Sequence, residues 1–297
     1  MRRRRHGRPI HGWLVLDKPA GVTSAKAVAA VIRLTGAAKA GHGGTLDPMA
    51  TGVLPIALGE ATKTVAYVMG STKVYRFTVR WGEARDTDDI DGAVIATSPV
   101  RPAAAEIVAA LAEFTGPIEQ VPPAFAAIKV GGERAYTLAR KGRPATLPAR
   151  PVRIDALSLI AHDDDSADFA MRCGKGTYVR ALARDLARRL GTVGHLAALR
   201  RTAVGRFAET DAISLEALAS VVHSGALCEY LRPVETALDD IPALAVTGGQ
   251  ADRLAHGQAV HVLGSDPGLV RVALDGRLIA LADVRDGRAR PVRVFNL

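Results

Sequence analysis

Residues 41–55, with the sequence GHGGTLDPMATGVLP, are the segment that most restricts how this chain can fold. Four glycines and two prolines surround Asp47, which is the only acidic residue between Lys39 and Glu60. Glycine adopts backbone angles closed to other residues and lets a ligand approach the main chain, while Pro48 favours an extended conformation at Asp47. The segment therefore predicts a shaped loop that presents one isolated carboxylate. The alternative is an ordinary turn in which the Asp47 side chain caps its own backbone.

The composition narrows the class of protein. The chain has 297 residues, of which 48% are hydrophobic, so a packed interior is expected, and no apolar run is long enough to span a membrane. An excess of 39 Lys and Arg over 30 Asp and Glu favours a polyanionic partner. Cys173 and Cys228 show no metal-ligand spacing and fit a reduced cytoplasm. The arginines at positions 2–5 predict a disordered basic tail over residues 1–9.

Hydrophobic periodicity predicts both strands and helices in residues 10–240. Tyr75, Phe77, Val79 and Trp81 alternate with polar residues, which is typical of a strand with one buried face. Further strands are expected at residues 13–16, 152–160 and 167–173, and helices at residues 25–34, 60–69, 102–114 and 177–190. The last helix carries arginines at every fourth position (180, 184 and 188), and such a charge stripe is usually solvated.

The final part of the chain has a different pattern. Residues 260–263, 269–274, 277–284 and 292–295 predict short strands, and the Asp-Gly pairs at 275–276 and 286–287 predict tight turns between strands. A small β-rich second domain over residues 241–297 is the simplest interpretation.

Several catalytic motifs are absent from the sequence. We find no HExxH, no CxxC pair, no GxGxxG and no GxSxG. The GKGTYVR sequence at 174–180 is not a phosphate-binding P-loop, because Gly176 stands where that motif needs Ser or Thr. The acidic cluster at 86–91 is not an EF-hand, because Thr87 and Ser98 would occupy its first and twelfth ligand positions. The sequence thus contains none of these motifs for metal-dependent hydrolysis, hydride transfer or serine acyl transfer.

An isolated carboxylate still permits chemistry at a sugar. It can attack an anomeric carbon, stabilise an oxocarbenium-like sugar or remove a proton. Enzymes that hydrolyse glycosidic bonds generally use two carboxylates. A single carboxylate such as Asp47 better suits a reaction that breaks such a bond and re-forms it without water.

Separated motifs in this chain resemble those of one protein family, in the same order. They are GHGGTLDPMATGVLPIALGEATK (41–63), LDKPAGVTS (16–24), KVYRF (73–77), RDTDDIDG (85–92), QVPPAFAAIKVGGERAY (120–136), GKGTYVRALARDL (174–186) and LRRTAVG (199–205). Together they closely resemble the TruB family of tRNA pseudouridine synthases over residues 10–210. The resemblance implies an α+β fold with a central mixed or antiparallel sheet flanked by helices, a compact C-terminal PUA-type RNA-binding domain, and no metal or organic cofactor.

The resemblance also implies a reaction and its catalytic residues. The reaction is isomerisation of uridine to pseudouridine at position 55, in the TΨC loop of tRNA, on a base flipped out of its stack. Asp47 corresponds to the catalytic aspartate, acting either as a nucleophile or as a base that gives a glycal. Arg180 is expected to pair with Asp47 and, if buried, to keep it ionised. Tyr75 corresponds to the tyrosine that stacks on the flipped base, and Tyr178 lies beside Arg180 in the same motif.

Further positions are expected at the substrate by the same resemblance. His42 corresponds to the histidine that fills the vacated stack, and Leu199 to a pocket wall. Asp89 is expected to hold the site geometry, Lys18 to support the tyrosine region, and Lys63 to contact the substrate. Residues 124–150 resemble an insertion that folds over RNA, so we expect low order there without RNA.

Two other functions remain open at this point. The chain could be a non-catalytic protein that binds and folds tRNA, with Asp47 merely shaping a loop. It could also perform the same isomerisation at a different uridine. A monomer without membrane association is expected in each case.

Overall fold

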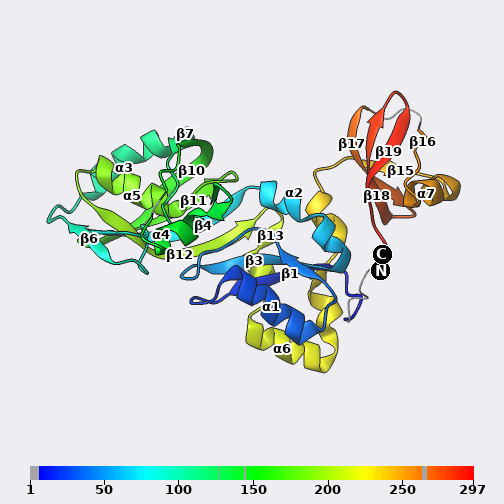
Figure 1. The fold of residues 1–297 in the computed structure, drawn as a ribbon, viewed down its shortest axis with the longest axis horizontal. Helices are drawn as coiled ribbons and strands as arrows, with labels where there is room; N and C mark the ends of the chain where they lie inside the picture. The colour runs from blue at the N-terminus through cyan, green and yellow to red at the C-terminus, as the bar shows by residue number, and fades with distance from the viewer. Residues whose placement is uncertain (1–6, 127, 144, 263–265) are drawn as a thin grey trace.

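The computed structural model describes residues 7–126, 128–143, 145–262 and 266–297, and its main feature is a ten-stranded mixed sheet (Figure 1). The order of the central strands is β14-β1-β3-β12-β4-β11-β10-β7, with β2 beside β3 and β13 beside β12. The bounds are β1 Gly12–Lys18, β2 Ala40–His42, β3 Thr51–Leu58, β4 Lys73–Trp81, β7 Gly116–Gln120, β10 Arg150–His162, β11 Ser166–Cys173, β12 Gly194–Val204, β13 Phe207–Ala208 and β14 Leu231–Arg232. Neighbours are antiparallel except β12 and β3, so the expected α+β class with a mixed sheet is confirmed.

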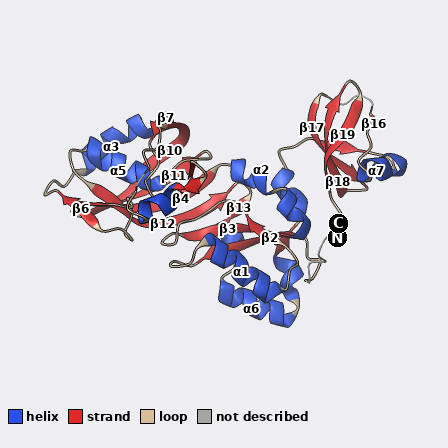
Figure 2. Ribbon diagram, in the orientation of Figure 1, coloured by secondary structure: helices blue, strands red, loops and turns tan. Residues whose placement is uncertain are grey.

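Helices cover the sheet near both ends (Figure 2). Helix α1 (Ser24–Thr35) begins where the Thr23 hydroxyl accepts a bond from Lys26 N and ends at Gly36, whose φ of 69° suits glycine. It packs beside α6 (Leu215–Ser224) at one end, while α3 (Ala104–Ala110) and α5 (Val179–Arg189) lie at the other. The remaining helices are α2 (Val65–Gly70), α4 (Ala135–Arg140), α7 (Gly248–Ala255) and the 3-10 turns Gly59–Lys63, Leu111–Phe114, Glu209–Asp211, Ala226–Tyr230 and Val234–Leu238. In the described part of the chain, no helix is long and apolar enough to cross a membrane.

The prediction of a continuous loop over residues 41–55 is wrong at both ends. Residues 40–42 form β2 and residues 51–58 form the buried strand β3, so the loop itself is confined to residues 43–50. The Pro55 carbonyl points away from β1, because it accepts a hydrogen bond from Gly43 N at 2.8 Å. The nitrogen and the carbonyl of a strand residue point to the same side, so the Pro55 nitrogen also points away from β1. Proline is therefore tolerated here, because its missing N–H is not needed for the pairing with β1.

Residues 243–294 build a second, five-stranded sheet in the order β15-β17-β18-β19-β16. These strands are β15 Ala243–Ala245, β16 Val260–His261, β17 Gly268–Leu274, β18 Arg277–Arg285 and β19 Arg288–Val294. The predicted turns connect them, with Asp275 and Asp286 both at φ 49°. Leu278, Leu281 and Phe295 pack with Trp13 in one apolar cluster, so this sheet rests on the first one. The predicted strand at 260–263 ends earlier, and Leu263 lies outside the described residues.

Two segments expected to lack order contain regular structure. Arg8 forms a β-bridge with Ala37, so the disorder predicted for residues 1–9 does not extend to Arg8, and residues 1–6 lie outside the described part of the chain. The RNA-covering segment at 124–150 contains a small hairpin of β8 (Lys129–Val130) and β9 (Glu133–Arg134), followed by α4, and residues 127 and 144 lie outside the description. A second hairpin, β5 (Glu83–Arg85) with β6 (Val94–Thr97), carries the acidic cluster.

Candidate active site

The loop that carries Asp47 is closed by a turn made from main-chain atoms. The carbonyl of Asp47 accepts a bond from Ala50 N at 3.1 Å, with Pro48 at the second turn position that proline favours. Ser24 holds the preceding residue from the side, since its hydroxyl donates to Leu46 O at 3.0 Å and accepts from Leu46 N at 2.8 Å. The Asp47 side chain is therefore not needed to close the turn.

Instead, the Asp47 carboxylate pairs with Arg180 at the start of α5. Arg180 Nε lies 2.9 Å from Asp47 Oδ2, and Arg180 Nη2 donates to Asp47 Oδ1 at 3.3 Å. The Arg180 side chain is 6% exposed and that of Asp47 is 34% exposed. The expected pair is thus present, with a buried guanidinium holding a carboxylate that a ligand can still reach.

Arg180 also contacts two further segments near this carboxylate, the turn at residues 87–89 and the chain at Phe125. It donates to Thr87 O at 3.0 Å and to Phe125 O at 3.1 Å, and its Nε lies 3.5 Å from Asp89 Oδ2. Burial raises the pKa of Asp89, while the Thr87 hydroxyl and the Arg180 charge lower it. Asp89 Oδ1 accepts from Thr87 Oγ1 at 2.6 Å and from Asp91 N at 3.1 Å, so this side chain caps its own turn, which is the alternative to a role in the site, while its Oδ2 faces Arg180.

The arginine stripe on α5 is not the uniformly solvated face that its spacing suggests. Arg180 is buried, and Arg184 is 13% exposed and bonds to Asp88 and Asp185. Only Arg188, 67% exposed, matches that interpretation. The stripe therefore runs from the site outward to solvent.

Lys18 supports the Asp47 loop from beneath and is fully buried. Its ammonium donates to three carbonyls, of Pro19 at 2.8 Å, Val22 at 2.6 Å and Pro48 at 3.2 Å. Burial lowers the pKa of Lys18 to about 8, although the charge of Asp47 raises it. Lys18 was expected among the substrate residues, in support of the tyrosine region, and in the structure its ammonium holds the carbonyl of Pro48, the residue next to Asp47.

The aromatic candidates gather around the same loop. Tyr75 on β4 is 8% exposed, and burial raises the pKa of its hydroxyl, to which Asp47 adds a smaller effect in the same direction. Tyr178 caps α5, its N–H donating to Gln120 Oε1 at 2.8 Å, and burial raises the pKa of its hydroxyl as well. His42 ends β2 with Nδ1 buried and unbonded, and burial lowers its pKa.

Lys63, for which a substrate contact is expected, bonds within the protein in this structure. Its ammonium contacts Glu60 Oε2 at 2.5 Å, donates to Val294 O at 2.7 Å and lies 5.8 Å from the centre of the Phe295 ring. Lys63 therefore connects the first sheet to the second.

Sequence reasoning missed Arg201, which is 1% exposed and lies on β12 opposite Tyr75. The LRRTAVG motif contained the signal, but only Leu199 was selected from it. Arg201 contacts the main chain on both sides of Asp47, through the carbonyls of Gly44 and Val53.

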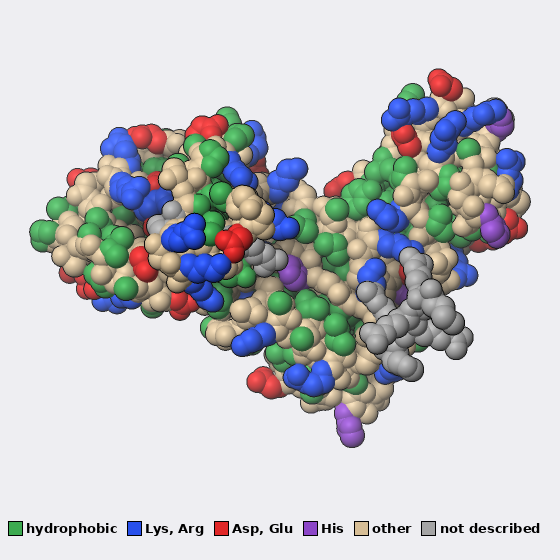
Figure 3. All heavy atoms as spheres, viewed as in Figure 1, with side chains coloured by type: hydrophobic (Ala, Val, Ile, Leu, Met, Phe, Trp, Pro, Cys, Tyr) green, Lys and Arg blue, Asp and Glu red, His purple; other side chains and the backbone are tan. Residues whose placement is uncertain are grey.

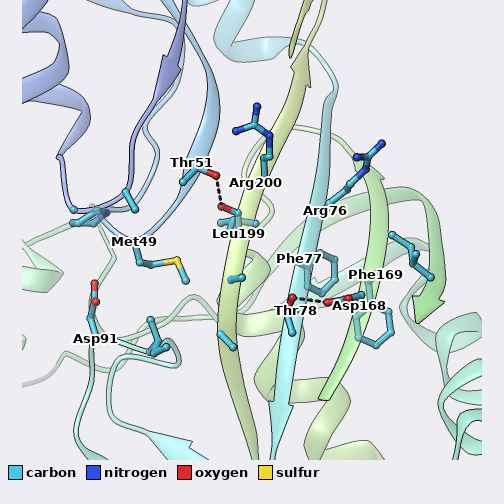
Figure 4. A pocket seen from close by; sticks show the side chains of 17 residues that line it. Met49, Thr51, Arg76, Phe77, Thr78, Asp91, Asp168, Phe169, Leu199 and Arg200 are labelled. Carbon is cyan, nitrogen blue, oxygen red and sulfur yellow. Dashed lines mark hydrogen bonds between the residues drawn. The ribbon is translucent and has the colours of Figure 1, made fainter. Parts of the chain in front are cut away.

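A cavity of about 630 Å³ lies beside the loop (Figure 4). Its wall includes Pro48, Met49, Arg76, Thr78, Asp168 and Leu199, whereas Asp47, Tyr75 and Arg180 do not line it. Arg76 and Thr78 alternate with Tyr75 along β4, while Phe77 and Leu199, which also line the cavity, lie opposite each other on the Tyr75 face. Leu199, for which a pocket wall is expected, thus lines a cavity that begins at the two residues after Asp47. Among the described residues, no group of three or more His, Cys, Asp or Glu could hold a metal ion.

Comparisons with known proteins agree on one family. A model of the TruB family pseudouridylate synthase N-terminal domain matches residues 32–179, a tRNA pseudouridylate synthase B C-terminal domain matches residues 180–239, and a tRNA pseudouridine synthase II C-terminal model matches residues 241–296. The chain is 58% identical to tRNA pseudouridine synthase B of Rhodopseudomonas palustris, covering 99% of this chain and 83% of that protein. It is 56% identical to the protein of the same name from Gluconacetobacter diazotrophicus, covering 99% and 100%.

Solved structures agree in fold. The chain superposes on a chain of a Cbf5-Nop10-Gar1 complex with a TM-score of 0.73 and 25% identity, over 96% of this chain and 84% of that one. It superposes on a chain of an H/ACA RNP bound to a substrate RNA containing 2'-deoxyuridine with a TM-score of 0.75 and 24% identity, over 100% and 92%.

Proposed function

The chain belongs to the TruB family of pseudouridine synthases, and from this premise we propose which of its residues isomerise uridine in tRNA. It is an enzyme, a tRNA pseudouridine synthase that converts uridine to pseudouridine. The target in the proposal is the uridine at position 55, in the TΨC loop. The observation that carries the residue assignment is the partly exposed Asp47 carboxylate held by a buried Arg180.

In the proposed reaction, the target nucleotide leaves its stack and enters the space next to Asp47. Asp47 acts at the ribose, as a nucleophile or as a base, while the N-glycosidic bond breaks. The uracil then turns, and its C5 bonds to C1′. Exclusion of water matters because hydrolysis of the intermediate would leave an abasic nucleotide.

The neighbouring residues have supporting roles in this proposal. Arg180 orients the carboxylate through two contacts, and Tyr75 provides the aromatic face for the uracil. Tyr178, at the α5 N-terminus, and His42, at the end of β2, are assigned to the walls of the space that receives the flipped nucleotide.

Asp47→Asn tests this assignment, because it keeps the shape of the side chain and removes its charge. We expect single-turnover formation of pseudouridine to fall by about 10⁴-fold or more, as for the removal of other essential nucleophiles. The dissociation constant for tRNA is expected to stay within about threefold. Retained modification would remove Asp47 from the mechanism.

The two alternative functions are separated by different measurements. A protein that only folds tRNA would give the same refolding activity with Asp47→Asn and no pseudouridine with either form. A synthase for another uridine would leave the TΨC loop unmodified, so mapping pseudouridine on tRNA incubated with the purified protein decides the target.

The surroundings of the reaction are also part of the proposal. We assign residues 241–297 to a PUA-type domain that contacts tRNA, and we infer a monomer in the cytoplasm, with both cysteines free as found here.

Lys and Arg side chains are spread over both lobes on the face shown in Figure 3, with acidic side chains between them. Binding is expected to weaken steeply with salt, since phosphate contacts release counterions.

A further inference from the structure

We propose that Arg201 is a positioning residue that holds the Asp47 loop in place beside Tyr75, an inference that rests on the function proposed above. Arg201 lies on β12 directly opposite Tyr75 on β4, and its side chain is 1% exposed. In the described part of the chain, the carboxylates that contact β12 arginines bind Arg200, not Arg201. A buried guanidinium without such a partner is costly unless its hydrogen bonds are satisfied.

The bonds of Arg201 go to main-chain carbonyls around Asp47. Its Nη2 donates to Gly44 O at 3.0 Å and its Nη1 to Thr45 O at 3.4 Å, both just before Asp47. Its Nε donates to Val53 O at 2.8 Å, beyond the loop on β3. One rigid, planar group therefore ties together the two chain segments that enter and leave the loop.

The bond from Arg201 to Val53 O replaces a strand hydrogen bond that β3 lacks at this position. On the side away from β1, β3 pairs with β12 at residues 51–52 and with β2 at residues 56–58, which leaves residues 53–55 without a strand neighbour. The Val53 carbonyl in this interval is taken by Arg201, and the Pro55 carbonyl by Gly43 N. Without Arg201, the buried carbonyl of Val53 would lose this hydrogen bond, at the point where the Asp47 loop joins β3.

The same guanidinium lies beside Tyr75, because Arg201 and Tyr75 are cross-strand partners on β12 and β4 and share one face of the sheet. Burial raises the pKa of the Tyr75 hydroxyl, and the positive charge of Arg201 opposes this effect. Arg201 therefore contacts the main chain around Asp47 and adjoins the tyrosine that faces the same loop.

The alternative is that Arg201 merely stabilises the fold, and Arg201→Lys separates the two roles. Lysine keeps the charge but loses the planar fork that reaches both chain segments. The matched control is Arg200→Lys on the same strand, because Arg200 is 36% exposed and its carboxylate partners, Asp17 and Glu209, are not part of the Asp47 site.

We expect Arg201→Lys to lower the single-turnover rate by about 100-fold with the tRNA dissociation constant within about threefold, because small misplacement of reacting groups costs that much. The Gly43 and Leu46 amides are expected to exchange hydrogen faster while those of β4 do not change. The ¹⁹F resonance of 3-fluorotyrosine at Tyr75 should also shift. Arg200→Lys should leave all three measurements unchanged.

Two results would overturn the inference. One is a wild-type rate for Arg201→Lys, and the other is a loss of rate that follows the loss of tRNA binding and of thermal stability in proportion. Wild-type protein and Asp47→Asn are assayed in parallel, because a wild type that forms no pseudouridine would refute the proposed function instead.

Discussion

The Asp47 loop and the segment at 124–150 both border the site, but they are held in different ways. The loop accepts hydrogen bonds from buried Lys18, Ser24 and Arg201, and its Asp47 forms an ion pair with Arg180. The other segment has a core of Ala126, Ala135 and Leu147 with a few partly buried neighbours. The reactive group is thus fixed before the substrate arrives, whereas the part expected to cover RNA has little to hold it in one place.

The largest expected effect comes from the residue that connects the two regions. Arg180→Met leaves Asp89 and Asp47 without their cation, and removing one partner of a buried pair typically costs about 3 to 5 kcal/mol of unfolding free energy. Activity should fall by about 100-fold or more in protein that is still folded. Urea unfolding and single-turnover kinetics measure the two effects. Arg188→Met, on the exposed end of the same helix, is the control and should change stability by less than about 0.5 kcal/mol.

A substitution inside β3 tests how tightly the loop is anchored. Gly52 has a φ of 95°, and a Cβ there would lie 2.3 Å from Arg201 O. We expect Gly52→Ala to lower the unfolding free energy by about 2 to 4 kcal/mol, from backbone strain and the clash together. Gly191→Ala is the control, because its φ of 72° is also positive but its Cβ would meet no atom within 4 Å. An equal decrease in unfolding free energy for the two variants would show that β3 and the loop shift at little cost to accept the added methyl group.

The pH dependence of stability tests the support given by Lys18. Its pKa is lowered to about 8 in the folded protein, from 10.5, so between pH 8 and 10.5 the unfolded chain binds more protons than the folded one. The contribution of Lys18 to stability therefore rises with pH in this window, by at most about 1.4 kcal/mol per pH unit. Lys18→Met should lose this rise relative to wild type in urea unfolding at pH 8, 9 and 10. Parallel curves would mean that Lys18 is not buried as described.

The smallest effect is expected in the segment at 124–150. Leu147→Ala should change the global unfolding free energy by less than about 1 kcal/mol, because that residue belongs to a small separate cluster. Leu54→Ala, in the main core, should cost about 2 to 5 kcal/mol. Hydrogen exchange over residues 124–150 should be faster than over the Asp47 loop and should slow when tRNA is added. Equal protection without tRNA would remove the contrast between the two regions.

Sequence patterns predicted those parts of the fold that follow a simple period. Strand β4 alternates strictly and the turns at 275–276 and 286–287 have the expected residues, so all were found. Strand β3 was missed because its TGVLPIAL sequence is buried on both faces and contains glycine and proline, which gives no alternation.

The site shows the same limit. Motif resemblance selected Asp47, Tyr75 and Arg180, which the structure brings together. It did not select Arg201, because a buried arginine bonded to carbonyls has no signature in charge or periodicity. Lys18 and Lys63 were selected from the same motifs, but their partners within the protein could not be predicted. Only the folded chain shows which carbonyls and carboxylates lie within reach of an ammonium group.

The residues that hold Asp47 come from positions 18, 24, 180 and 201, which are far apart in the chain. While the ribosome is still synthesising the first 180 residues, Lys18 and Ser24 are present, but the aspartate lacks both arginines, Arg180 and Arg201. We therefore expect a nascent or prematurely terminated chain not to break glycosidic bonds in nearby RNA, because the proposed site is complete only after two-thirds of the chain has been translated and folded.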